Sequence, residues 1–205
     1  LYPYQARGVE WMLDTIRHTG GLILADEMGL GKTVQIIALL ADYRESCTLG
    51  EQPALPSLIV VPRSLVWNWQ AELSRFSPQL KVVDYTGSGR KHHLGNAREA
   101  DLVLTTYGTL RRDIESLREI RFRYAVLDEA QAIKNAKSLS AKACRLIDAG
   151  QRLAITGTPV ENHLGELWSL FEFLNPGLLG SAKAFGNLTK NSKNRTDPES
   201  AAMLS

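Results

Sequence analysis

Six short aliphatic runs, separated by segments of helical periodicity, constrain the fold of this chain more than any other feature. The runs show little alternation of apolar and polar residues, which is typical of strands covered on both faces. They occupy residues 21–25, 57–61, 80–85, 101–106, 123–128 and 152–156. Repeated strand–helix–strand units connect through right-handed crossovers. The sequence therefore predicts an α/β fold, a three-layer α/β/α domain with a mainly parallel sheet.

The segments around these runs predict helices, three of which have a clear apolar face. An opening helix is indicated by Val9, Met12, Leu13 and Ile16. A second helix presents Leu65, Trp69 and Leu73, and we expect Ser64, after Pro62, to be its N-cap. A last helix presents Leu164, Leu167, Trp168, Phe171 and Leu174, and it should stop at the Asn-Pro-Gly of residues 175–177.

We expect the domain to cover residues 1–180. From Ser181 the composition shifts to Lys, Asn, Ser and Thr, so residues 181–205 are predicted to be a polar linker or the start of an extension that needs a missing partner. No apolar run approaches the roughly 18 residues that cross a bilayer, and no signal segment is visible, so we expect no membrane association. Cys47 and Cys144 match neither a disulfide framework nor a metal site, which favours a cytoplasmic compartment.

Charge alone does not identify a nucleic-acid-binding protein, because the net charge is only +2 and the pI is about 8.6. Two local basic clusters exist, one within residues 90–98 and one within residues 111–123. Acidic residues are interleaved with the second cluster, and we interpret it as a solvated helix face with ion pairs.

The stretch LADEMGLGKTVQ, residues 24–35, fits the phosphate-binding pattern G-x-x-x-x-G-K-[ST] except at Asp26. A predicted strand ends just before it, and a helix opens at Lys32 and Thr33, so free N–H groups would point at phosphates. Glycines allow close backbone approach, Lys32 can neutralise β and γ oxygens, and the Thr33 hydroxyl can bind Mg²⁺. Asp26 is compatible with this role if its φ is negative. The candidate nucleotide-binding residues of the loop are Asp26, Glu27, Met28, Gly29, Leu30, Gly31, Lys32 and Thr33.

A second candidate motif, RYAVLDEAQ, is a buried-type strand that ends in two acids. Asp128, at the strand end, would hold Mg²⁺, and Glu129 could orient and deprotonate the water that attacks a γ-phosphate. The alternative is that the two acids merely begin a loop or cap a helix. The upstream phosphate loop favours the catalytic interpretation.

With these motifs in order, the chain resembles a known family. ADEMGLGKT, LDEAQAIKN and ITGTPVEN are similar to motifs I, II and III of the Swi/Snf-type ATPases, which are DNA translocases of helicase superfamily two. The resemblance covers about residues 1–180, and it implies the first of two RecA-like lobes that bind ATP and Mg²⁺. Asp is usual in that family at the place of Asp26. The sequences of LDEAQAIKN and of the segment after ITGTP resemble bacterial members of the family more than eukaryotic chromatin remodellers.

The resemblance also implies roles for single residues. Gln5 in LYPYQ matches an adenine-contacting residue, although Tyr2 stands where the family commonly has Arg. Gln131 matches the residue that senses the γ-phosphate, so the catalytic candidates are Lys32, Asp128, Glu129 and Gln131. The segment that couples hydrolysis to DNA movement matches Thr156, Gly157 and Thr158. Segments that touch a DNA backbone suggest contacts from Ser64, Thr105 and Thr106, which could equally be a helix cap and strand-end hydrogen bonds.

The resemblance implies a motor lobe of a DNA-dependent ATPase that translocates on double-stranded DNA and remodels protein–DNA complexes. It would act with a second RecA-like lobe that this chain lacks, so we expect the chain alone to bind ATP and hydrolyse it poorly. Two alternatives stay open: a DEAD-box-like RNA helicase lobe, against which ITGTP argues, and a nucleotide-gated interaction module. We expect a cytoplasmic location, nucleoid-associated in a bacterium, or a nuclear one in a eukaryote.

Overall fold

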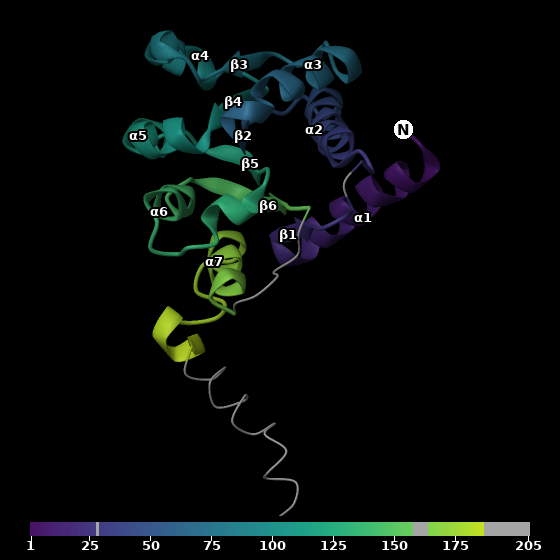
Figure 1. Cartoon of the computed structure of the whole chain (residues 1–205). Coiled ribbons are helices and arrows are strands. Elements are labelled where there is room, and N and C mark those ends of the chain that lie inside the picture. The colour runs from purple at the N-terminus through teal and green to yellow at the C-terminus, as the bar shows by residue number, and fades with distance from the viewer. Residues whose placement is uncertain (28, 158–163, 187–205) are drawn as a thin grey trace, which may run out of the picture.

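The fold is built on a six-stranded sheet in which every pair of neighbouring strands is parallel, in the order β1-β6-β5-β2-β4-β3 (Figure 1). The computed structural model describes residues 1–27, 29–157 and 164–186. Each strand coincides with one of the predicted aliphatic runs. The strands are β1 (Gly21–Leu24), β2 (Ser57–Val61), β3 (Val82–Asp84), β4 (Leu102–Thr106), β5 (Phe122–Leu127) and β6 (Ala149–Ile155).

Helices cover both faces of the sheet, which confirms the three-layer prediction (Figure 1). One face is covered by α1 (Pro3–Thr19), α2 (Lys32–Leu49) and α3 (Val66–Phe76). The other is covered by α4 (Leu94–Ala97), α5 (Tyr107–Leu117), α6 (Leu139–Arg145) and α7 (Leu164–Leu174). Short 3₁₀ turns, η1 (Arg63–Leu65), η2 (Ser88–His93) and η3 (Ala130–Ile133), follow three of the strands.

The two layers have separate apolar cores because strand side chains alternate between the faces. In β2, Leu58 and Val60 point into the core under α5, α6 and α7, whereas Ile59 and Val61 point into the core under α1, α2 and α3. All four are fully buried. Burying an aliphatic side chain of this size contributes about 1.5–3 kcal/mol, so these strands cannot alternate with polar residues without losing one core.

Two sequence predictions about helices were wrong. The last helix, α7, ends before the Asn-Pro-Gly as predicted and buries Leu174, but its other buried residues are Ser169, Leu170 and Phe173, while Leu167, Trp168 and Phe171 are only partly buried. This helix is apolar on nearly every side, so periodicity did not identify the inward face. The side chain of Leu164 lies outside the described part of the chain.

Ser64 is not a helix N-cap. The turn η1 intervenes after Pro62, Leu65 occupies the N-cap position of α3, and Ser64 is exposed in the middle of the turn. Of the face predicted for this helix, Trp69 and Leu73 are buried as expected.

Because all strands run the same way, their carboxyl ends meet at one edge of the sheet. The loops that leave β1, β5 and β6 lie along one half of this edge, and those that leave β2, β4 and β3 lie along the other. Ligands of open parallel sheets bind outside this edge. Among the helices of the described residues, none is long and apolar enough to cross a membrane.

Candidate functional site

The loop between β1 and α2 has the backbone conformation that its sequence requires. Gly29 and Gly31 have φ values of 86° and 74°, in the left-handed region that favours glycine. Among the described residues, the non-glycine positions with positive φ are Glu51 and Glu129. Asp26 is therefore not in that region, which explains why the first glycine of the phosphate-binding pattern can be replaced here.

Gly31 also allows the close approach of Gln5. A Cβ placed on Gly31 would lie 2.4 Å from Gln5 Nε2. That nitrogen donates to the Leu30 carbonyl at 3.3 Å, and Gln5 Oε1 accepts from the Tyr2 N–H at 3.0 Å. The structure thus brings Gln5 against the loop, with its amide engaged by the backbone on both sides.

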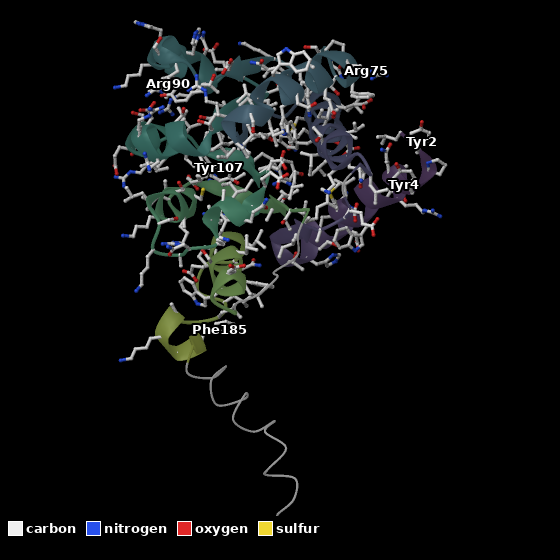
Figure 2. All side chains as sticks on the ribbon, viewed as in Figure 1. Tyr2, Tyr4, Arg75, Arg90, Tyr107 and Phe185 are labelled. Carbon is white, nitrogen blue, oxygen red and sulfur yellow. The ribbon has the colours of Figure 1, made fainter. Side chains whose placement is uncertain are left out.

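A cavity of about 390 Å³ lies beside Gln5, between α1 and the loop. Its lining residues are Tyr4, Gly8, Trp11, Leu24, Asp26, Leu30 and Gln35. Tyr2 and Tyr4 project from the start of α1 and stack with nearly parallel rings, 6.0 Å between centroids (Figure 2). The sequence analysis did not identify this aromatic pair. Tyr4 lines the cavity and Tyr2 is exposed beside it, and exposed aromatic rings are suited to stacking on a planar ligand.

Lys32 occupies the mouth of the loop. Its ammonium donates to the carbonyls of Asp26 at 2.6 Å and Glu27 at 3.0 Å. These carbonyls satisfy the charge in the way that phosphate oxygens would, so a bound triphosphate has to replace them. The space is open at Gly29, where an added Cβ would have no neighbour within 4 Å. Met28 lies outside the described residues.

Asp128 emerges from the end of β5 and is only 8% exposed. Its Oδ2 accepts from Trp69 Nε1 at 2.8 Å, and its Oδ1 accepts from the Glu129 N–H at 2.9 Å. Burial raises the pKa of this carboxyl, while the hydrogen bonds from Trp69 and Glu129 and the charge of Lys32 act in the opposite direction. A cation beside it would favour the ionised form. The loop after β1 and the end of β5 lie at the same edge of the sheet, with β6 between the two strands.

Two residues that hold Asp128 were missed by the sequence analysis as parts of the site. Trp69 had been identified only as a core residue of its helix. Tyr107, at the start of α5, donates its hydroxyl to the Asp128 carbonyl at 2.7 Å. A buried indole or phenol needs a polar partner, so the sequence could predict that a partner exists. It could not predict which residue that partner is.

Glu129 and Gln131 form the rest of the acidic motif. Glu129 has φ 50° and ψ 54°, a left-handed conformation that costs a non-glycine residue about 1 kcal/mol or more. Gln131 Nε2 donates to Glu129 Oε2, and Thr156 Oγ1 donates to Gln131 Oε1 at 3.2 Å. Gln131 therefore bridges the end of β5 to the end of β6. Gly157 follows, partly buried, and Thr158 lies outside the described residues.

Magnesium would find two protein ligand candidates here, the Thr33 hydroxyl in the first turn of α2 and the Asp128 carboxylate. In the part of the chain that the structure describes, no cluster of three or more His, Cys, Asp or Glu could hold a metal. Mg²⁺ usually takes one or two carboxylates and completes its shell with phosphate oxygens and water, so these two residues are the candidates that the chain offers.

The three candidates for DNA contact are placed differently from one another. Ser64 is exposed. Thr105 is fully buried, and its hydroxyl donates to the Tyr85 carbonyl at 2.8 Å. Thr106 caps α5 by accepting from the Thr109 N–H at 3.2 Å. Thr105 and Thr106 thus have the structural roles that the sequence analysis left open as an alternative, and the Thr105 hydroxyl is closed off from solvent.

Beside these residues, over the ends of β2, β4 and β3, lies a hollow of about 620 Å³ that we call the arginine hollow. Its lining residues are Arg63, Val66, Trp67, Gln70, Thr86, Gly87, Ser88, Arg90, Thr106, Thr109 and Arg112. Trp67 is 76% exposed. In the described ranges, neither Arg63 nor Arg112 forms an ion pair. The hollow therefore offers unneutralised positive charge next to an exposed aromatic ring.

Arg90, which lines the hollow, is held in place by a buried carboxylate. Its Nε and Nη2 donate to the two oxygens of Asp113 at 2.5 Å and 3.1 Å. The hydrogen bond from Arg90 is the largest cause that lowers the pKa of Asp113. Asp113 sits at a break in α5, with φ −116° and ψ 16°. The pair fixes η2 against α5 and shapes the wall.

The family model for the SNF2-related domain matches residues 4–205 of this chain. An ATP-dependent helicase of Mycoplasma genitalium, MG018, is 41% identical, over 95% of this chain and 18% of its own length. The TATA-binding protein-associated factor MOT1 of Saccharomyces cerevisiae is 39% identical, over 100% of this chain and 12% of its own length. A putative ATP-dependent helicase/translocase of Bacillus subtilis, YwqA, is 43% identical over 90% of this chain. The chain spans about a fifth or less of these relatives, and bacterial proteins are among them.

Solved structures agree with this match. The Sulfolobus solfataricus SWI2/SNF2 ATPase core in complex with double-stranded DNA superposes with a TM-score of 0.81 and 42% identity, covering 90% of this chain and 38% of that one. The same core solved as a domain has a TM-score of 0.81, 39% identity, and covers 100% of this chain and 41% of that one. The fold is thus the RecA-like α/β fold of these ATPase cores, and the Swi/Snf resemblance inferred from the motifs is confirmed.

Proposed function

This chain belongs to the SNF2-related domain family, and from that premise we propose that it is the ATP-binding motor lobe of a DNA-dependent ATPase. The whole protein would translocate on double-stranded DNA and remodel protein–DNA complexes. The Sulfolobus relative was solved with double-stranded DNA, which supports a duplex as the partner. A DNA-bound protein would be located where the DNA is, which is the nucleoid of a bacterium or the nucleus of a eukaryote.

One observation carries the proposal: the phosphate loop after β1 and the acidic motif after β5 lie at the same sheet edge on either side of β6, and Gln131 joins Glu129 to Thr156 at the end of β6. Each group then has a task. Lys32 and the N–H groups at the start of α2 hold the β and γ phosphates. The cavity beside Gln5, with the stacked Tyr2 and Tyr4, receives the adenine.

Hydrolysis needs a base and a sensor near the γ-phosphate. Glu129, aimed by its left-handed backbone, accepts the proton of the attacking water. Thr33 and Asp128 would hold Mg²⁺, which supplies neutralisation of the phosphate charge and polarisation of the γ-phosphoryl group. Gln131 contacts both Glu129 and Thr156, so a change at the base reaches the segment that begins at Thr156.

The chain alone should turn over slowly. Arginines that stabilise phosphoryl-transfer transition states raise the rate by roughly 10³ to 10⁵, and in this family they would come from a second RecA-like lobe. Movement along DNA also needs closure of two lobes around ATP. We therefore assign this chain nucleotide binding and one side of the DNA path, and we assign efficient hydrolysis to the pair of lobes.

For DNA binding, the arginine hollow supports contacts to the DNA backbone through positive charge and stacking. The buried hydroxyls of Thr105 and Thr106 are not needed for such contacts. Arg63 and Arg112 can each neutralise a phosphate, and Trp67 can pack against sugar or base. Ser64 is exposed beside Arg63 and stays a candidate.

Titration of the chain with a non-hydrolysable ATP analogue and Mg²⁺ tests the proposal. We expect saturable binding that Lys32→Ala weakens on the order of 10²-fold, because the ammonium is the main cationic contact to the phosphates. Lys81→Ala, a surface lysine before β3, is the matched control and should bind as the parent does. Absence of saturable binding, or no effect of Lys32→Ala, would contradict the proposal. Brisk DNA-stimulated hydrolysis by residues 1–205 alone would contradict the slow turnover.

A further inference from the structure

We propose that Trp69 and Tyr107 are positioning residues that transmit occupation of the arginine hollow to the nucleotide site by fixing Asp128. The inference rests on the proposed function, since it concerns how the DNA side and the ATP side of that function communicate.

The two residues reach Asp128 from two different walls of the hollow. Trp69 lies on α3, whose outward side presents Trp67 and Gln70 to the hollow. Tyr107 begins α5, whose next turns present Thr109 and Arg112 to the same hollow. Figure 2 places Tyr107 near the middle of the molecule, beside the sheet, whereas Arg90 lies at the periphery. Each of the two helices, α3 and α5, therefore lines the hollow with some of its side chains and donates one hydrogen bond to Asp128.

The contacts grip Asp128 at both of its ends. The Trp69 indole donates to carboxylate Oδ2 at 2.8 Å, and the Tyr107 hydroxyl donates to the main-chain carbonyl at 2.7 Å. With one end of the residue tied to α3 and the other to α5, a shift of either helix moves or rotates the carboxylate. Groups that hydrogen-bond to a metal-binding residue orient it, and their loss typically costs 10- to 100-fold in metal affinity or activity.

Both donors are buried, so their partners are fixed. Trp69 is fully buried and Tyr107 is 8% exposed. An indole N–H can only donate, and the Tyr107 hydroxyl donates its proton to the Asp128 carbonyl, which can only accept. A buried hydrogen bond is costly to break without replacement, so Asp128 follows these two groups when they move.

No equivalent connection runs from the hollow to the phosphate loop among the hydrogen bonds of the described residues. Lys32 bonds to its own loop, and Gln5 bonds to the loop and to Tyr2. Asp128 is thus the point where the walls of the hollow meet the nucleotide site. Trp69 reaches it across 59 positions of sequence and Tyr107 across 21.

The test measures a coupling ratio: the affinity of the chain for a non-hydrolysable ATP analogue with Mg²⁺, with and without a saturating blunt-ended DNA duplex. Linkage requires the duplex affinity to change by the same factor when the analogue is present. For the parent chain we expect a ratio of at least about fivefold, the lower end of typical couplings. Trp69→Phe and Tyr107→Phe should each bring the ratio to within about twofold of one.

A structural defect would weaken binding or lower the Tm without specifically erasing the ratio. Tyr124→Phe is the control, because Tyr124 is equally buried but packs edge-on against Tyr43 on the α2 side of the sheet. It should keep the parent ratio. The double variant Trp69→Phe/Tyr107→Phe should be no worse than either single variant, because both act on one residue. Tyr107→Phe removes a single oxygen, so it serves if Trp69→Phe does not fold.

The outcomes distinguish failure of the coupling role from failure of the proposed function. If the parent chain binds both ligands but its ratio is one, or if both variants keep the parent ratio, this inference is overturned and the proposed function stands. If the chain binds no ATP analogue at all, the proposed function falls and the inference falls with it.

Discussion

The two halves of the sheet edge use polar groups in opposite ways. Around β1, β6 and β5 the functional groups contact one another: Lys32 bonds its own loop, and Gln131 joins Glu129 to Thr156. Around β2, β4 and β3 the hydroxyls are satisfied internally, while Arg63, Arg112 and Trp67 face the solvent. One half is a closed set of contacts that a ligand must open, and the other is an open charged surface.

This difference matches what each half would recognise. A triphosphate has a fixed shape and a reacting atom, so groups held within hydrogen-bond distance of one another can be aimed at it. A DNA backbone repeats the same charge along its length, so it can be held by exposed cations without fixed geometry. Arg90 is the exception, because Asp113 holds it rigidly, and it shapes the wall more than it supplies charge.

The largest effect should come from replacing the proposed general base of the closed half. Glu129→Gln, made in a protein that joins this chain to its second lobe, should lower turnover by about 10² to 10⁴, since general-base catalysis contributes that much. ATP binding should persist, because Gln can still accept from Gln131 and Lys32 is untouched. Steady-state hydrolysis and analogue titration measure the two quantities.

Glu119→Gln removes a carboxylate from the exposed ion pairs of Arg118 and is the matched control. It should change neither turnover nor binding. A Glu129→Gln protein that still hydrolyses ATP near the parent rate would show that another group accepts the proton. One that fails to bind the analogue would show that Glu129 acts on binding instead.

Neutralising the open half should have a smaller and different effect. Arg63→Ala with Arg112→Ala should weaken duplex binding by about 10- to 100-fold at moderate salt, whatever the DNA sequence, and reduce the salt slope by about 2, one for each lost phosphate contact. Fluorescence anisotropy across a salt series measures both. Nucleotide affinity without DNA should not follow this change, because neither arginine lines the nucleotide cavity.

Arg75→Ala with Arg118→Ala is the control of equal charge, since both arginines lie outside the hollow. If the control pair weakens DNA binding as much as the hollow pair, net charge explains the effect and the hollow is not the contact surface.

The closed half was largely predictable from sequence, because its signals are local. The phosphate loop lies between a strand and a helix, and the left-handed Gly29 and Gly31 fall where the pattern demands glycine. Each of the six aliphatic runs overlaps a strand, and the signal is strongest at β2 and β4, which are buried along their whole length. The exception at Asp26 depended only on the sign of φ, a condition that could be stated in advance.

What failed from sequence depended on orientation or on contacts between distant residues. Thr105 lies in a strand that is buried on both faces, so alternation could not tell whether its hydroxyl faced a ligand or Tyr85. Trp69 was visible as a core residue, but its bond to Asp128 exists only once α3 packs on β5. Arg63, Arg90 and Arg112 come from three separate segments, which the strand order β2-β4-β3 brings together.

The smallest effect should come from two threonines at the end of β4, within the open half. Thr105→Val removes the hydrogen bond to the Tyr85 carbonyl, and Thr106→Ala removes the cap of α5, so each should lower the free energy of unfolding by about 1 kcal/mol. Thr105→Val should leave duplex affinity unchanged, because the hydroxyl of Thr105 is fully buried.

Chemical denaturation and DNA titration separate the two roles, with Thr48→Val, at an exposed threonine of α2, as the control. If Thr105→Val weakens duplex binding tenfold while its unfolding free energy matches the parent, the hydroxyl must turn outward when DNA binds, and the open half is rearranged by its ligand just as the closed half is.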